Sequence, residues 1–149
     1  MSLQDEVMTA MKAAMKTKNQ TALTALRAIK SAILLAKTES GAQSELTEEQ
    51  ELKILQKQVK QRKDSAAIFI EQGREDLAAP ELAEAEVISQ FLPEALSEAE
   101  IESVVVATID SIGAEGMKDM GKVMGIVSKE LAGQADGKTI SNIVKAKLS

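Results

Sequence analysis

The sequence predicts an all-α fold, and three observations lead to this prediction. Apolar residues recur at the 3.6-residue period of a helix along most of the 149 residues. Glycine and proline are sparse, at 8 and 2 residues. β-branched residues seldom alternate with polar ones, as a half-buried strand requires. Together these patterns favour seven helices and no sheet.

The first helix is expected to follow Ser2, a preferred N-cap residue, and the second to end near Ser40-Gly41. Methionines on the first helix are interpreted as core residues, with an adaptable partner surface as the alternative. The inner faces of the two helices comprise Leu3, Val7, Met8, Met11 and Met15, and then Ala22, Leu26, Ile29, Ile33 and Ala36.

The segment Thr47-Glu48-Glu49-Gln50 has the pattern of a capping box and opens a long third helix. Gly73 is a suitable stop for that helix. A shorter fourth helix is expected to run up to Phe91-Leu92, and Pro80 within it is tolerable only near the first turn. The inner face of the third helix comprises Leu52, Leu55, Val59, Ala66, Phe69 and Ile70.

Pro93 breaks the chain, and Ser97-Glu98-Ala99-Glu100 is a second capping box. Gly113 ends the helix that this box starts, and Gly133 and Asp136-Gly137 form a turn between the last two helices. The sequence thus predicts an N-terminal domain of about four helices over residues 1–93 and a C-terminal three-helix domain over residues 94–149. Apolar positions of the last three helices are Ile101, Val104, Val105, Ile109 and Ile112; Met120, Val123, Met124, Val127 and Leu131; and Ile140, Ile143, Val144 and Leu148.

Composition excludes several functional classes. The chain has no Cys and no His, so disulfides, thiolate zinc sites and a cysteine nucleophile are excluded, and we expect no metal and no cofactor. Phe69 and Phe91 are its only aromatic residues, too few for stacking of single-stranded bases. Short apolar runs and an acidic N-terminus argue against a membrane span or a signal peptide. We therefore expect a soluble cytoplasmic protein.

Charge is segregated along the chain, although the net charge is -5. Residues 7–38 hold six bases and no acid, and residues 53–63 hold five bases and no acid. Residues 75–115 hold eleven acids and no base, and residues 118–149 hold six lysines against three acids. The overall charge argues against DNA as a partner, whereas the basic blocks allow a local surface for RNA.

Lysines at positions 53, 57 and 60 follow the i, i+4, i+7 spacing and share one face of the third helix. With basic residues of the first two helices they predict a surface that holds a phosphate backbone without reading bases. The alternative is a solvated helix face whose acids are supplied by other helices. The candidate RNA-binding residues are Arg27, Lys30, Lys53, Lys57, Lys60, Arg62, Lys63, Arg74, Lys118, Lys122, Gly121, Gly125 and Lys138.

The segment from Gly116 to Val123 nearly matches the phosphate-loop pattern, but Val123 has no hydroxyl for magnesium and the preceding apolar run has a helical period. Nucleotide hydrolysis is therefore rejected. Gly121 and Gly125 lie one helical turn apart, which favours close approach of a neighbouring helix or of a bound phosphate. Lys118 and Lys122 stand near that helix N-terminus, where free N–H groups attract anions.

No catalytic residues are recognisable. Without His or Cys, a nucleophile requires Ser or Thr with Lys, and the adjacent Ser128 and Lys129 face different ways on a helix. Carboxylate pairs such as Glu84 and Glu86 have ordinary surface spacing. The residues favour a binding protein over an enzyme.

Three motifs resemble the GatB/YqeY family. They are Leu26-Arg27-Ala28-Ile29-Lys30-Ser31-Ala32-Ile33; Gln61-Arg62-Lys63-Asp64-Ser65-Ala66 followed by Phe69, Gly73-Arg74-Glu75-Asp76-Leu77 and Phe91-Leu92-Pro93; and Lys118-Asp119-Met120-Gly121-Lys122-Val123-Met124 followed by Gly133, Asp136-Gly137 and Val144. The motifs occur in order over nearly the whole chain, so the chain resembles a stand-alone YqeY-like protein. Pro80 departs from the family pattern, in which an ordinary helix former is expected.

The resemblance implies an all-helical, two-part fold. Its C-terminal part is similar to the tail of the B subunit of tRNA-dependent amidotransferases, which helps to hold tRNA. The family label is carbon–nitrogen ligase activity with glutamine as amido-N-donor. This chain lacks the Gly-Gly-Ser-Ser amidase signature and the cradle that activates the carboxyl group with ATP. The resemblance therefore implies association with tRNA or an amidotransferase without independent catalysis.

Three functional hypotheses remain open. The first is an accessory module that binds tRNA or another structured RNA. The second is a ligase component that acts with a separate amidotransferase or aminoacyl-tRNA synthetase. The third is a protein–protein adaptor with no RNA role, which uses the methionine-lined faces or the acidic stretch of residues 75–115.

Overall fold

The computed structural model describes residues 2–39 and 45–149. Its described residues form seven α-helices and one short 3₁₀ helix, with no strand among them, so the all-α prediction is confirmed. The elements are α1 (Leu3–Thr17), α2 (Gln20–Glu39), α3 (Glu48–Glu71), α4 (Glu75–Ser89), α5 (Glu98–Ile112), η1 (Met117–Asp119), α6 (Met120–Glu130) and α7 (Gly137–Leu148).

The chain divides into two compact units, Met1–Leu92 and Pro93–Ser149. Whether these units are separate folding domains, as predicted for residues 1–93 and 94–149, stays a prediction. The expected end of the second helix at Ser40-Gly41 lies outside the described residues.

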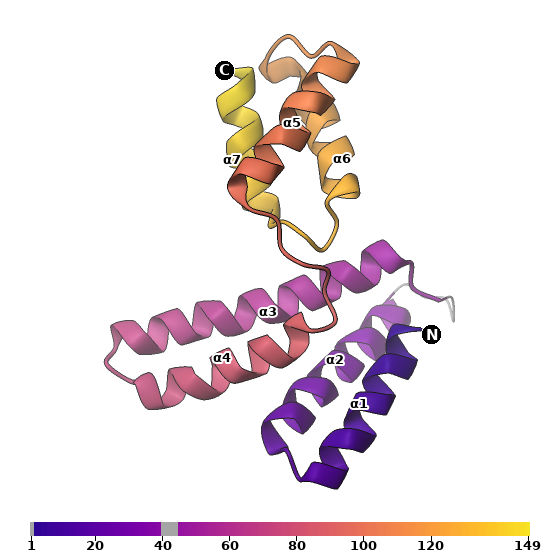
Figure 1. The fold of residues 1–149 in the computed structure, drawn as a ribbon, viewed down its shortest axis with the longest axis vertical. Helices are drawn as coiled ribbons and strands as arrows, with labels where there is room; N and C mark the ends of the chain where they lie inside the picture. Colours follow the sequence, from indigo (N-terminus) through magenta and orange to yellow (C-terminus); the bar gives the residue numbers. More distant parts are fainter. Residues whose placement is uncertain (1, 40–44) are drawn as a thin grey trace. The chain divides into compact units, whose positions relative to one another are not determined.

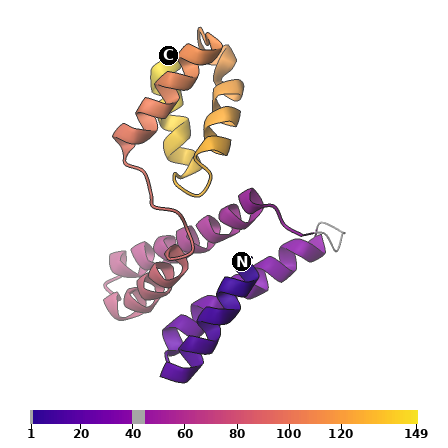
Figure 2. The ribbon, with the colours of Figure 1, turned by 45° about the vertical axis from the view of Figure 1, so that its right-hand side comes forward.

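The N-terminal unit consists of two helical hairpins, α1–α2 and α3–α4 (Figure 1). Helix α2 packs against both helices of the second hairpin, which lies beside α1–α2 in both views (Figures 1 and 2), and the turns of the two hairpins point apart in Figure 1. One hydrophobic cluster joins the hairpins. It comprises Leu3, Val7, Ala14, Leu23, Ala25, Leu26, Ile29, Ile33, Leu55, Val59, Ala85 and Ile88.

Two predicted caps are confirmed. The Ser2 side chain accepts a hydrogen bond from the Asp5 N–H, and the Asp5 carboxylate accepts from the Ser2 N–H. Thr47 and Gln50 make the same reciprocal pair at the start of α3, at 3.1 and 2.8 Å. Because these bonds satisfy amide donors that a helix start leaves free, they determine where α1 and α3 begin.

The interpretation of the methionines of α1 as core residues is wrong for two of the three. Met8 is 40% exposed and Met15 is 54% exposed, whereas Met11 is partly buried. The buried line of α1 runs through Val7 and Ala14. Met8 and Met15 each follow this line by one residue, about 100° around the helix, and so lie beside the core.

The α3–α4 turn follows the prediction at Gly73, which has a φ of 72° and stops α3. Ile70, in the last turn of α3, is 49% exposed and does not join the inner face as predicted. Pro80 is the sixth residue of α4, so the prediction that it lies near the first turn of this helix is also wrong. Its side chain is exposed and the helix continues through it, ending at Ser89 rather than at Phe91-Leu92.

The C-terminal unit is a three-helix bundle of α5, α6 and α7, as predicted. Ser97 caps α5 by accepting from the Glu100 N–H at 3.2 Å, and Gly113 ends it with a φ of 66°. The Leu96 N–H donates to the Gln134 carbonyl and ties the segment before α5 to the α6–α7 turn. Its own core cluster comprises Ile101, Val105, Val123, Val127, Leu131, Ile140, Val144 and Leu148.

None of the described helices combines the length and the hydropathy that a membrane crossing requires.

Candidate nucleic-acid interface

The lysines of α3 share an exposed face, as the spacing predicts, but acids of the same helix compensate two of them. Lys53 lies 3.4 Å from Glu49, and Lys60 lies 2.8 Å from Asp64. Lys57 makes no ion pair with the residues that the structure describes. The compensating acids thus come from α3 itself rather than from other helices, and the stripe carries less positive charge than the sequence indicates.

Arg62 does not belong to this surface, because its side chain is only 14% exposed between α3 and α4. Its Nη1 donates to the Gln58 carbonyl and side-chain oxygens at 3.2 and 2.7 Å. Its Nε lies 3.5 Å from the Glu84 carboxylate, whose side chain is 16% exposed, and makes no hydrogen bond. Arg62 therefore joins two helices, whereas its neighbour Lys63 is exposed.

Arg74 is engaged by the carboxylate of Asp76. Its Nε and Nη2 donate to the two Asp76 oxygens at 3.1 and 3.0 Å. This bidentate contact lowers the pKa of Asp76 from its ordinary value and raises the pKa of Arg74. Both side chains are exposed, so phosphate has to compete with Asp76 for this arginine.

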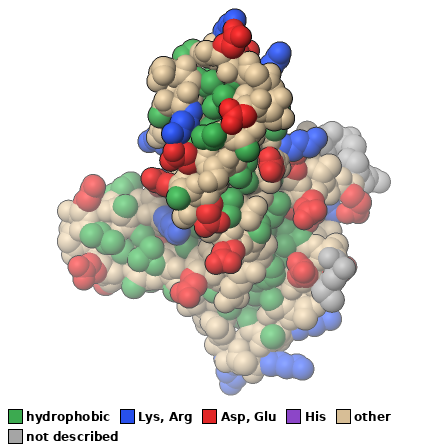
Figure 3. Space-filling model, turned by 45° about the horizontal axis from the view of Figure 1, so that its top comes forward, with side chains coloured by type: hydrophobic (Ala, Val, Ile, Leu, Met, Phe, Trp, Pro, Cys, Tyr) green, Lys and Arg blue, Asp and Glu red, His purple; other side chains and the backbone are tan. Residues whose placement is uncertain are grey.

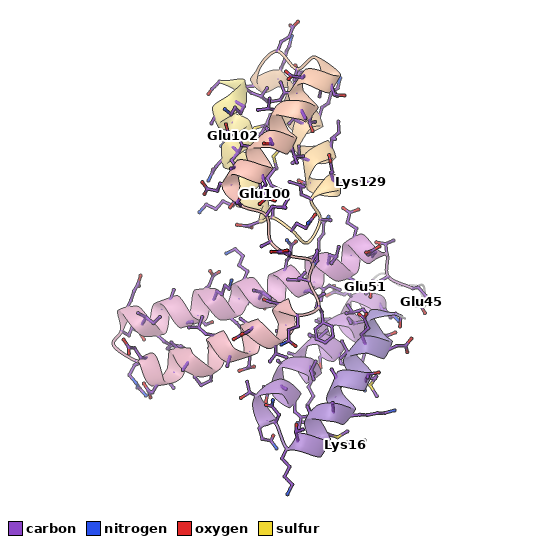
Figure 4. All side chains as sticks on the ribbon, viewed as in Figure 1. Lys16, Glu45, Glu51, Glu100, Glu102 and Lys129 are labelled. Carbon is purple, nitrogen blue, oxygen red and sulfur yellow. The ribbon has the colours of Figure 1, made fainter. Side chains whose placement is uncertain are left out.

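Further positive charge that no described acid compensates lies on the α1–α2 hairpin. Arg27 and Lys30 are exposed on α2 and make no ion pair with described residues. Lys16 extends into solvent near the turn of the same hairpin (Figure 4). That Arg27 and Lys30 form one surface with the α3 lysines stays a prediction.

A second basic surface, the glycine–lysine face, lies on η1 and α6 and comprises Lys118, Gly121, Lys122, Gly125 and Lys129. All five residues are exposed. Lys122 and Lys129 are seven residues apart and share a side of the helix with Lys118. Lys129 was not among the residues predicted from the sequence, although its spacing from Lys122 identifies it, and Figure 4 shows it projecting from α6.

The two glycines of this face are open to solvent. A Cβ atom built on Gly121 or Gly125 meets no atom within 4 Å. The interpretation that a neighbouring helix packs closely on them within this chain is therefore wrong, and the phosphate alternative stays a prediction. With no side chain at either position, the helix backbone is accessible between the flanking lysines.

Acidic neighbours weaken only one end of the glycine–lysine face. Lys118 lies 3.8 Å from Glu115, and both side chains are at least 74% exposed. Lys122 and Lys129 make no ion pair with described residues. Lys138 is exposed in the first turn of α7, which follows the C-terminal end of α6 and is therefore remote from Lys118.

An open groove of about 420 Å³ runs between α5 and α6. Its lining is largely apolar, and Thr108, its one buried polar residue, donates its hydroxyl to the Val104 carbonyl at 2.9 Å. Ser103, Ala107 and Ser111 lie one turn apart on α5, and their small side chains leave space for the groove. Their spacing is the feature of the sequence from which the groove could have been predicted. The lining comprises Ser103, Val104, Ala107, Thr108, Ser111, Ile112, Ile126 and Glu130.

Titratable groups in the described part of the chain do not assemble into a reactive cluster. No group of three or more acids there is placed to hold a metal ion. The pKa of Glu51 is raised by its partial burial and by the nearby Glu48 and Glu45 (Figure 4), but this residue lines neither groove nor basic face. The features that stand out among the described residues are exposed cations and open helix backbone, which suit contact with phosphate.

Comparison with known proteins identifies relatives over most of the chain. The family model described as Yqey-like protein matches residues 4–148. A protein of Pyrenophora tritici-repentis named "Altered inheritance of mitochondria protein 41, mitochondrial" is 32% identical over 144 residues, covering 92% of this chain and 78% of its own length. A protein of the same name from Clavispora lusitaniae is 40% identical over 103 residues, covering 68% of this chain and 53% of its own length.

A third relative is part of a larger enzyme. It is one of the subunits of glutamyl-tRNA(Gln) amidotransferase in Thermococcus gammatolerans, and it is 40% identical over 73 residues, covering 46% of this chain and 12% of its own length. The names of the two fungal relatives place those proteins in mitochondria, and the cytoplasmic location expected from the sequence stays a prediction for this chain. The match over residues 4–148 shows that the chain belongs to the Yqey-like protein family.

Proposed function

We propose that the chain is an accessory protein that holds tRNA on the glycine–lysine face of α6 and acts with an amidotransferase whose active site lies on another chain. The observation that carries this proposal is the exposure of Gly121 and Gly125 between lysines that no described acid compensates, at Lys122 and Lys129.

Phosphate is the chemistry that this face suits. Lysine ammonium groups attract phosphate oxygens without reading bases. The missing side chains at Gly121 and Gly125 let a bulky backbone approach the helix axis more closely than any other residue permits. Folded RNA, recognised by shape and phosphate position, offers such a backbone without the aromatic stacking that this chain cannot provide.

The relation to the archaeal amidotransferase supports tRNA as the RNA and amide transfer as the process. The match covers 12% of that relative, so most of its length has no counterpart in this chain. A chain without His or Cys has few groups for nucleophilic release of ammonia. The proposal therefore assigns holding of tRNA to this protein and catalysis to a partner.

Filter binding of tRNA at several salt concentrations tests the site. Lys122→Ala combined with Lys129→Ala should lower the slope of log affinity against log salt by roughly 1.4–1.8, at 0.7–0.9 per lost phosphate contact. The matched control, Lys53→Ala with Lys60→Ala, removes two lysines that acids of α3 already engage and should change the slope much less. Equal slopes for the α6 variant and the parent would show that this face does not hold tRNA.

A second candidate function is a protein adaptor without an RNA role, and the open groove between α5 and α6 favours it. Capture of partners from a lysate with and without ribonuclease separates the two functions. Loss of the captured amidotransferase components after ribonuclease treatment supports the tRNA proposal. Retention of a protein partner with no RNA supports the adaptor, and amide transfer by the purified chain alone overturns the accessory role.

A further inference from the structure

The two hairpins of the N-terminal unit carry opposite charge on their outer parts. The basic arm is the outer part of α1–α2, residues 12–27, and it contains no acid. The acidic arm is the outer part of α3–α4, residues 62–84. It holds six acids and three bases, and Glu71, Glu75 and Glu81, like the exposed Lys63, make no ion pair with described residues. The cations of the basic arm, which also make none, are Lys12, Lys16, Lys18 and Arg27.

The acidic arm buries few large apolar side chains, although its two helices pack closely. Its buried residues are Ala66 and Ala78, and the ion pair of Arg62 with Glu84 is the polar link between its helices. No residue of this arm belongs to the unit's hydrophobic cluster. Two helices that pack mainly through alanines bury little apolar area. A partner that covered this arm would therefore add substantially to its buried apolar area and to its stability.

Large apolar side chains are exposed on both arms. Ile68, Ile70, Leu77 and Leu82 of the acidic arm are 53, 49, 38 and 43% exposed, and Met15 of the basic arm is 54% exposed. Figure 3 shows hydrophobic side chains gathered on the outer part of α3–α4 and Lys or Arg at the end of α1–α2. Exposed apolar groups next to charges of one sign are typical of a surface that meets a partner of the opposite sign.

We infer that the acidic arm is a docking surface for the basic arm of a second copy of this chain. The outer ends of the two arms point apart within one copy, as Figure 1 shows, so neither covers the other. RNA does not suit the acidic arm, because glutamates repel phosphate. A second copy supplies four cations and an exposed methionine to a surface of three unpaired glutamates, one unpaired lysine and four exposed aliphatic side chains, so the charges remain complementary.

The arrangement closes into a dimer. Each copy presents both arms, so two copies related by a two-fold axis make the basic-to-acidic contact twice. The contact has an apolar and a charged part. Met15, Ile70 and Leu82 become buried in it, and the opposite charges determine how the two copies are oriented. This inference does not depend on the proposed tRNA function.

Sedimentation velocity of the full chain measures the contact. The parent protein should sediment as a dimer, at twice the 15.9 kDa chain mass, in low salt and should dissociate as salt rises. The basic-arm variant carries Lys12→Glu, Lys16→Glu and Arg27→Glu, and the acidic-arm variant carries Glu71→Lys, Glu75→Lys and Glu81→Lys. Each variant alone should raise the dimer dissociation constant roughly tenfold or more, because like charges then face each other.

Mixing the two variants makes the test specific. In a heterodimer of the two variants, the unchanged basic arm of one copy meets the unchanged acidic arm of the other. At the second contact the two substituted arms meet, and their charges are again opposite. The mixture should therefore dimerise, while each variant alone stays monomeric. A control with Lys57→Glu, Lys138→Glu and Lys145→Glu changes the net charge as the basic-arm variant does, outside both arms, and should still dimerise. Circular dichroism confirms that each variant is folded before it is compared.

Two results would overturn the inference. One is a parent chain that sediments as a monomer at every salt and protein concentration tested. The other is a pair of folded arm variants that dimerise as well as the parent or fail to associate when mixed.

Discussion

At the scale of single residues, Arg62 shows how a residue that the sequence assigns to a surface can be held inside the fold. Its guanidinium group lies between α3 and α4 with Gln58 and Glu84. Along the α3–α4 interface the neighbouring buried positions of α3 hold the apolar residues Val59 and Ala66, whereas Arg62 pairs with Glu84 between them. Its role in the structure is to join the helices where alanines leave little apolar contact.

We therefore expect Arg62→Ala to lower the free energy of unfolding by roughly 1–3 kcal/mol, because Glu84 then loses its cation at a mostly buried position. Urea unfolding measures the change. The double variant Arg62→Met with Glu84→Leu should recover much of the loss, since neither charge is left unpaired. A single variant as stable as the parent would contradict this account.

Glu51 provides a test that depends on pH. Partial burial, with Glu48 and Glu45 nearby, raises its pKa from the ordinary value of 4.5. The folded state therefore holds this proton more tightly than the unfolded state, and stability falls as pH rises through the raised pKa. Glu51→Gln should be more stable than the parent at pH 7 and equal to it below about pH 4. A stability difference that does not depend on pH in urea unfolding would show that the carboxylate charge is not responsible.

At the scale of elements, helix α6 contains an interior glycine that makes it less stable than an alanine would. Gly125 lies in the helix interior with a negative φ, and an added Cβ meets nothing within 4 Å. Alanine at this position removes backbone entropy from the unfolded chain without a steric cost. The glycine thus costs stability, and the proposed approach of tRNA to this face would account for it.

Gly125→Ala should accordingly raise the free energy of unfolding by roughly 0.5–1 kcal/mol and weaken tRNA binding at the same time. Gly113→Ala is the matched control, because Gly113 has equal space but a φ of 66°, so alanine should destabilise by roughly 1 kcal/mol. Thermal unfolding and filter binding provide the two measurements. Undiminished tRNA binding by Gly125→Ala would argue against close approach of phosphate.

At the scale of the whole molecule, two hydrophobic clusters share no residue. Leu26 is fully buried in the first and Ile140 in the second. Truncation of either to alanine should cost roughly 2–5 kcal/mol in its own unit. Hydrogen exchange of the full chain should then accelerate in α1–α4 for Leu26→Ala and in α5–α7 for Ile140→Ala. Acceleration throughout the chain in either variant would show that the two units unfold together.

The sequence by itself determined the local structure of this protein. Helical periodicity predicted the elements, and the caps at Ser2, Thr47 and Ser97 predicted where three of them begin. These features depend on interactions between residues at most four apart, which a sequence displays directly. For the same reason the sequence predicted Gly121 and Gly125 one turn apart on the same helix, α6.

Only the tertiary structure decided which side chains are available at the surface. It buried Arg62 against Glu84, exposed Met8 and Met15, and left Gly121 and Gly125 without a neighbouring helix. These outcomes depend on which helices pack together and at which turn each one ends. Burial is a property of contacts between distant segments, so helical spacing predicts a face but not its partner.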